Sequence, residues 1–114
     1  MSKKSPHLYL EDILTSIIKI EEYINGFSLE SFTKDQKTID AVIRNLEIIG
    51  EAANNIPEEY IEKYTDIPWQ EMISMRNKVI HEYFGIDIEI LWQTIREDLP
   101  KLKEQIKKLP EVLK

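Results

Sequence analysis

The apolar residues of this chain recur at steps of three and four, which is the spacing of amphipathic helices and not the alternation of strands. A first long helix is predicted to begin at Ser5 and Pro6, because serine is a favoured cap and proline suits the first helical position. It is predicted to end at Asn25 and Gly26. A second long helix is predicted to start from a capping box formed by Thr33 and Gln36.

The second half of the chain continues the same periodicity. A short helix is expected after Pro57, and a longer one over about residues 69–84, where Gly85 breaks the pattern. Asp87 can cap a last helix. Pro100 is expected to kink or split that helix near Leu99, because proline has no amide N–H to donate.

No alternating strand pattern, hairpin turn or internal repeat is present. We therefore predict an all-α fold of the up-and-down type, with about four main helices plus short ones. The length of 114 residues suits a single domain over residues 1–114, because a chain of this size buries one core and not two.

The composition narrows the class of protein. With 42% apolar and 32% charged residues, it is that of an ordinary soluble domain. No apolar run is long enough to cross a bilayer, and the N-terminal residues lack the apolar core of a signal peptide. The chain has no cysteine, which excludes disulfides, zinc ribbons and thiol catalysis. We expect a cytoplasmic protein that does not contact membranes.

The net charge of −6 argues against general nucleic-acid binding through a basic face. The charge is uneven, since both ends are rich in lysine and the middle is acidic. The simpler explanation is a solvated acidic surface with basic ends. The functional alternative is an acidic body that suits a basic protein partner, with RNA held locally by Arg76, Lys78 and the lysine-rich tail.

Two neighbouring residues of the second long helix carry separate predictions. A glycine inside a helix costs about 1 kcal/mol against alanine, so we expect Gly50 to allow a close helix crossing. For Glu51 we favour a plain surface carboxylate over the alternative, an ion pair with Arg76.

The helix predicted over residues 69–84 breaks its own pattern. Arg76 and Tyr83 fall on its apolar face, seven residues apart, and an arginine there must be paired or hydrated. His81 lies about 140° further round, in line with Asn77. Two copies of the helix that meet at a two-fold axis would bring the Arg76 of one chain near the His81 of the other, so we expect a homodimer.

The spacing Arg76-x4-His81-x-Tyr83 resembles the HEPN superfamily of small all-helical RNases, and more closely the HepT toxins. The resemblance extends to segments upstream (residues 49–52 and 67–69) and downstream (residues 84–87 and 98–102) of that motif, in the family's order. These segments span most of the chain. The resemblance implies a toxin of a toxin–antitoxin system that acts as an endoribonuclease.

The residues fit metal-independent chemistry of that kind. His81 has no histidine or carboxylate at i+4, and the three glycines form no phosphate-binding loop, so no metal or cofactor is expected. In RNA cleavage the 2′-OH attacks the adjacent phosphate, His81 can move protons and Arg76 can stabilise the phosphate charge. Asn77 could orient His81 or bond a phosphate oxygen. On spacing alone, a surface histidine and a structural arginine are preferred; the resemblance reverses that preference.

The same resemblance implies how the enzyme is controlled. In HepT-like proteins a partner minimal nucleotidyltransferase, the antitoxin, attaches AMP to the tyrosine at the position of Tyr83. The ordinary role of a helical tyrosine is core packing with its hydroxyl at the rim. Two other functions remain open: a non-catalytic adaptor for a nucleotidyltransferase, and a structural dimer module.

Overall fold

The structure is a computed structural model that describes residues 5–81 and 85–113, apart from the side chains of residues 80, 81, 111 and 113. The regular elements in this part of the chain are all helices. The predicted all-α fold is therefore confirmed. No helix in the described part is both long and apolar enough to cross a lipid bilayer.

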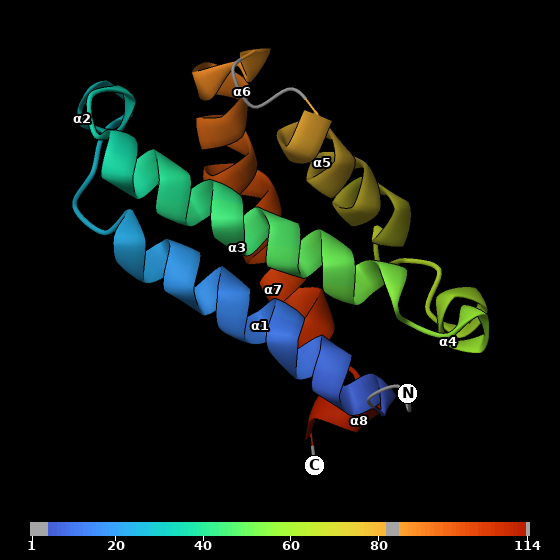
Figure 1. Ribbon diagram of the computed structural model, residues 1–114. Helices are drawn as coiled ribbons and strands as arrows, with labels where there is room; N and C mark the ends of the chain where they lie inside the picture. Colours follow the sequence, from blue (N-terminus) through green and yellow to red (C-terminus); the bar gives the residue numbers. More distant parts are fainter. Residues whose placement is uncertain (1–4, 82–84, 114) are drawn as a thin grey trace.

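A layer of three helices forms the centre of the fold. α1 (Pro6–Tyr23) and α3 (Gln36–Asn54) lie side by side and antiparallel, joined through the short α2 (Leu29–Thr33) (Figure 1). α5 (Trp69–His81) packs along the other edge of α3, after the short α4 (Glu58–Lys63). α3 is thus the middle helix, with both of its sides covered.

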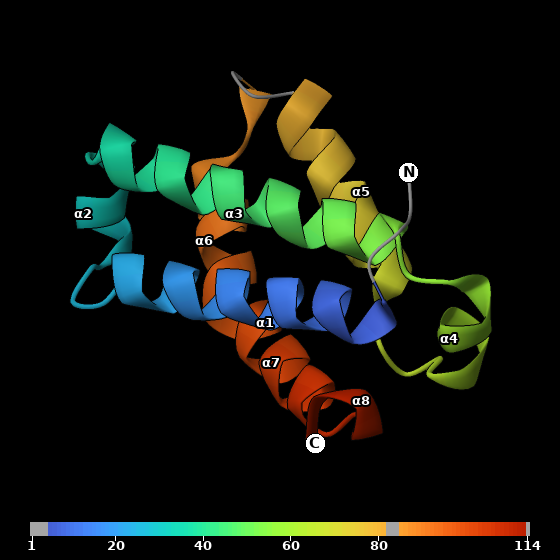
Figure 2. The same ribbon diagram turned by 60° about the horizontal axis from the view of Figure 1, so that its bottom comes forward.

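The last part of the chain crosses one face of this layer (Figure 2). It consists of α6 (Ile88–Gln93), a π-helical turn (Thr94–Asp98), α7 (Leu99–Lys107) and α8 (Pro110–Leu113). The Nζ of Lys103 on α7 donates to Glu21 Oε1 on α1 at 2.9 Å. This hydrogen bond and the charge of Glu21 raise the pKa of Lys103.

The core lies between the layer and the crossing helices. Its largest fully buried side chains are apolar: Phe32, Leu10, Ile13, Ile17, Ile20, Leu91, Ile95, Ile106, Val42 and Val79. Full burial of a large apolar side chain is worth about 1.5–3 kcal/mol, so these contacts dominate the stability of the fold. The indole N–H of Trp69 donates to the carbonyl of Tyr64 at 3.0 Å, which ties the start of α5 to the preceding turn.

The start of α3 differs from the prediction. Its cap is Asp35, whose carboxylate accepts the Thr38 N–H at 3.0 Å. The predicted capping box at Thr33 and Gln36 is wrong, because Thr33 belongs to α2 and its hydroxyl donates to the carbonyl of Leu29. Ser5 does occupy the cap position of α1, although its side chain accepts no capping hydrogen bond.

The last long helix is interrupted where its proline was expected to act. Asp87 caps α6 as predicted, with its carboxylate accepting two backbone N–H groups of the first turn. In the π-helical turn the N–H of Leu99 bonds the carbonyl of Thr94, five residues back instead of four. Pro100 next to it has no N–H, so one bond of the ladder is lost there. The predicted break near Leu99 is confirmed.

Candidate functional site

Gly50 on α3 is the point at which α5 comes very close to α3. A Cβ added at this position would lie 2.1 Å from the Cβ of Arg76 and 2.8 Å from the carbonyl oxygen of Met72. Such distances leave room for glycine alone. The close helix crossing predicted at Gly50 is therefore confirmed, and it places the stem of Arg76 directly against α3.

The guanidinium of Arg76 is held from two sides. Its Nη1 donates to Glu51 Oε2 at 2.5 Å, while its Nε and Nη2 both donate to Asn77 Oδ1, at 3.1 and 2.8 Å. The charge that interrupts the apolar face of α5 is therefore paired, as a largely covered guanidinium requires. The side chain of Arg76 is only 20% exposed.

For Glu51 the favoured interpretation, a plain surface carboxylate, is wrong, and the alternative, an ion pair with Arg76, is confirmed. Its side chain is 60% exposed, yet it makes the ion pair with Arg76. The reason is the close crossing at Gly50, which brings the next residue of α3 within reach of the guanidinium.

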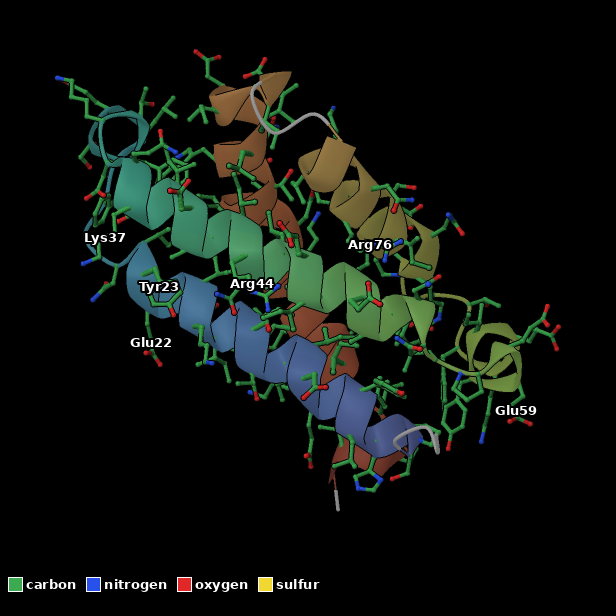
Figure 3. All side chains as sticks on the ribbon, viewed as in Figure 1. Glu22, Tyr23, Lys37, Arg44, Glu59 and Arg76 are labelled. Atoms are coloured by element: carbon green, nitrogen blue, oxygen red, sulfur yellow. The ribbon has the colours of Figure 1, made fainter. Side chains whose placement is uncertain are left out.

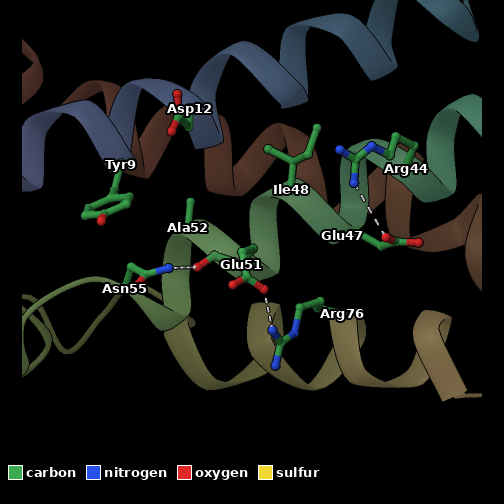
Figure 4. Close-up of a pocket in the computed structure, with 9 residues that line it drawn as sticks. All are labelled: Tyr9, Asp12, Arg44, Glu47, Ile48, Glu51, Ala52, Asn55 and Arg76. Atoms are coloured by element: carbon green, nitrogen blue, oxygen red, sulfur yellow. Dashed lines mark hydrogen bonds and ion pairs between the residues drawn. The ribbon is translucent and has the colours of Figure 1, made fainter. Parts of the chain in front are cut away.

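A groove of about 330 Å³ opens beside this ion pair, on the surface that α1, α3 and α5 share (Figure 4). It is lined by side chains of both charges and by one aromatic ring: Tyr9, Asp12, Arg44, Glu47, Ile48, Glu51, Ala52, Asn55 and Arg76. Arg44 projects from α3 and Arg76 from α5 (Figure 3). Arg44 Nη1 lies 3.7 Å from Glu47 Oε2 and its side chain is 70% exposed.

Of the residues predicted to form the site, the structure brings together Arg76 and Asn77. The Oδ1 of Asn77 accepts two hydrogen bonds from Arg76. The predicted contacts of Asn77 with His81 or with a phosphate oxygen stay predictions. Lys78 is exposed on α5. The side chain of His81 and the whole of Tyr83 lie outside the described residues, so their predicted roles stay predictions.

The groove also contains residues to which no role was assigned from the sequence, notably Tyr9 on α1 and Arg44 on α3. The sequence does contain a pattern that could have identified the groove residues on α3. Arg44, Glu51 and Asn55 recur at steps of seven and four on the polar face of that helix, which places them in one row.

The groove holds the fixed guanidinium of Arg76 among acidic and basic side chains. A guanidinium is the kind of group that binds an anionic oxygen. Across the described part of the chain, no group of three His, Cys, Asp or Glu side chains could hold a metal ion. The expectation of a metal-independent site stays a prediction.

Comparison with known proteins gives consistent matches. The model of the family described as "Ribonuclease HepT-like" matches residues 13–109. "Probable ribonuclease HepT" of Thermococcus cleftensis is 50% identical over 107 residues, covering 94% of this chain and 97% of that protein. A "Putative RNase" of Caldanaerobacter subterraneus subsp. tengcongensis is 45% identical over 106 residues, covering 93% and 95% of the two chains.

A "Putative RNase" of Methanocaldococcus jannaschii is 43% identical over 114 residues, covering 100% of this chain and 92% of that protein. No solved structure gives a significant match.

Proposed function

Because the chain belongs to the family of HepT-like ribonucleases, we propose that it is a metal-independent endoribonuclease and the toxin of a cytoplasmic toxin–antitoxin system. The observation that carries this proposal is the orientation of Arg76. Its guanidinium is held by Glu51 and Asn77 beside an open groove, on the helix that also contains His81.

The proposed reaction needs no protein nucleophile. The ribose 2′-OH attacks the adjacent phosphorus, the bond to the 5′-oxygen of the next nucleotide breaks, and a 2′,3′-cyclic phosphate forms. His81 transfers a proton at the attacking or the leaving oxygen, which suits a group that titrates near neutral pH. Arg76 stabilises the negative charge that builds up on the phosphate oxygens. Lys78, exposed on the same helix, supports binding of the RNA backbone.

We place the complete site in a homodimer. Arg76 and His81 are five residues apart, and on a regular α-helix two such positions are separated by about 140° around the axis. Two α5 helices that face each other across a two-fold axis would combine the arginine of one protomer with the histidine of its partner.

Regulation is proposed to act on Tyr83, two residues after His81. AMP attached there by a cognate minimal nucleotidyltransferase, the antitoxin, would bring a phosphate toward Arg76 and fill the volume that the RNA phosphate needs. The modification should inhibit by occlusion and not by unfolding.

The direct test is an RNase assay of protein expressed without the nucleotidyltransferase, run in EDTA beside His81→Ala. We expect the wild type to cleave RNA in EDTA and the variant to be inactive. Cleavage that disappears in EDTA and returns with magnesium would contradict the metal-independent reaction. A folded, unmodified wild type that cleaves no RNA would favour the non-catalytic adaptor instead.

A further inference from the structure

We propose that Glu51 is a positioning residue for cleavage: it holds the guanidinium of Arg76 in the direction in which that group meets the phosphate. This inference rests on the proposed ribonuclease function. Its geometric basis is the contact between Arg76 Nη1 and Glu51 Oε2 at 2.5 Å, made between two helices by residues 25 positions apart.

Stability alone does not account for this ion pair. The carboxylate of Glu51 is 60% exposed, so water screens its side of the ion pair and limits what the pair contributes to folding, although the side chain of Arg76 is only 20% exposed. The crossing of α3 and α5 is already set by the contact of Gly50 with the stem of Arg76. What Glu51 adds is the direction of the guanidinium at the end of that stem.

The donors of Arg76 are divided in a way that suits this role. A guanidinium has five N–H donors, and the described residues engage three of them: one by Glu51 and two by Asn77. The described residues leave one N–H on Nη1 and one on Nη2 unengaged, and these two can donate to phosphate oxygens. Glu51 and Asn77 thus hold the group in place before substrate arrives, which lowers the cost of orienting it during the reaction.

The carboxylate has a second effect of opposite sign, because its negative charge repels RNA. The two effects separate in the variants. Glu51→Ala removes both the acceptor and the charge, whereas Glu51→Gln removes the charge and keeps an oxygen that can accept from Nη1. If Glu51 acts as a positioning residue, glutamine at this position keeps most of its function and alanine does not.

The experiment measures kcat and KM on one RNA for wild type, Glu51→Ala and Glu51→Gln. We expect Glu51→Ala to lower kcat by about tenfold or more, in line with the cost of misplaced catalytic groups, and to change KM by less than about threefold. Glu51→Gln should keep kcat within about threefold of wild type, because it still holds the guanidinium. A kcat of Glu51→Ala equal to or above that of wild type would overturn the proposal, since the contact with Glu51 would then not help Arg76 in catalysis.

A second readout follows Arg76 itself. The exchange of its guanidinium N–H groups with water, measured by NMR and assigned with Arg76→Lys, should become faster in Glu51→Ala, which removes the acceptor of Nη1, and stay slow in Glu51→Gln. Glu47→Ala is the matched control, since it removes a carboxylate from the same groove and helix without a contact to Arg76. Equal effects of Glu47→Ala and Glu51→Ala on exchange would mean a general charge effect, and the proposal would be wrong.

The two proposals can fail separately. Inactive wild-type protein would overturn the ribonuclease function and this inference with it. Active wild type with an equally active Glu51→Ala would overturn the inference alone. Circular dichroism checks the fold, and an unfolded Glu51→Ala would show that the pair is structural and also overturn the positioning role.

Discussion

Replacing Gly50 by alanine tests the close crossing on which the whole site depends. The added Cβ would lie 2.1 Å from the Cβ of Arg76 and 2.8 Å from the carbonyl oxygen of Met72. Carbon atoms in contact are normally about 3.5–4.0 Å apart, so α5 must move away from α3 by roughly 1.5 Å or cross it differently. Neither atom is the far end of a flexible side chain, which leaves little room for local adjustment.

The expected change in the free energy of unfolding is the difference between two opposing terms. Overpacking costs about 1–3 kcal/mol, and the rigid neighbours at Gly50 favour the upper part of that range. The better helix propensity of alanine offsets about 1 kcal/mol. We therefore expect Gly50→Ala to lower the free energy of unfolding by about 1–2 kcal/mol, or the Tm by roughly 4–8 °C for a chain of this length.

Thermal unfolding followed by circular dichroism measures this change. All variants must be compared at one protein concentration, because the Tm of the proposed homodimer would depend on it. Gly85→Ala is the matched control: a Cβ there would meet nothing within 4 Å, so its Tm should stay the same or rise slightly. A Gly50→Ala protein as stable as wild type would refute the reasoning about the crossing.

Three further predictions concern the proposed activity. Arg76→Ala should lose RNA cleavage and toxicity while keeping its helicity by circular dichroism; an unfolded variant would mean that Arg76 is mainly structural. Light scattering at micromolar concentration should show a homodimer, and a monomer would argue strongly against the shared site. Coexpression with the nucleotidyltransferase should add AMP to Tyr83, seen by peptide mass spectrometry, and silence cleavage. Tyr83→Phe should keep the fold and escape that silencing; AMP on another residue would contradict the assignment.

Many features of this fold could be predicted from the sequence because they depend on near neighbours. The helices follow from apolar residues at steps of three and four, and the carboxylate of Asp87 caps α6 as its position predicts. The break before Pro100 follows from a missing N–H. The spacing of Arg76, His81 and Tyr83 indicated the family, which the match over residues 13–109 confirms.

Local signals gave the wrong cap at the start of α3. Thr33 and Asp35 can both cap a helix, and their side chains differ little in that preference. Thr33 is not the cap because it belongs to α2, where its hydroxyl donates to the carbonyl of Leu29. Asp35 was then the residue directly before the first turn of α3.

The sequence by itself determined the helices, the reactive residue types and their order along α5. Only the tertiary structure decided which group pairs with Arg76. Glu51 is 25 residues away, and nothing local distinguishes it from the other carboxylates of α3. The physical reason is the crossing at Gly50: the absence of one side chain lets two helices approach, and that approach selects the partner of the arginine and leaves the groove beside it.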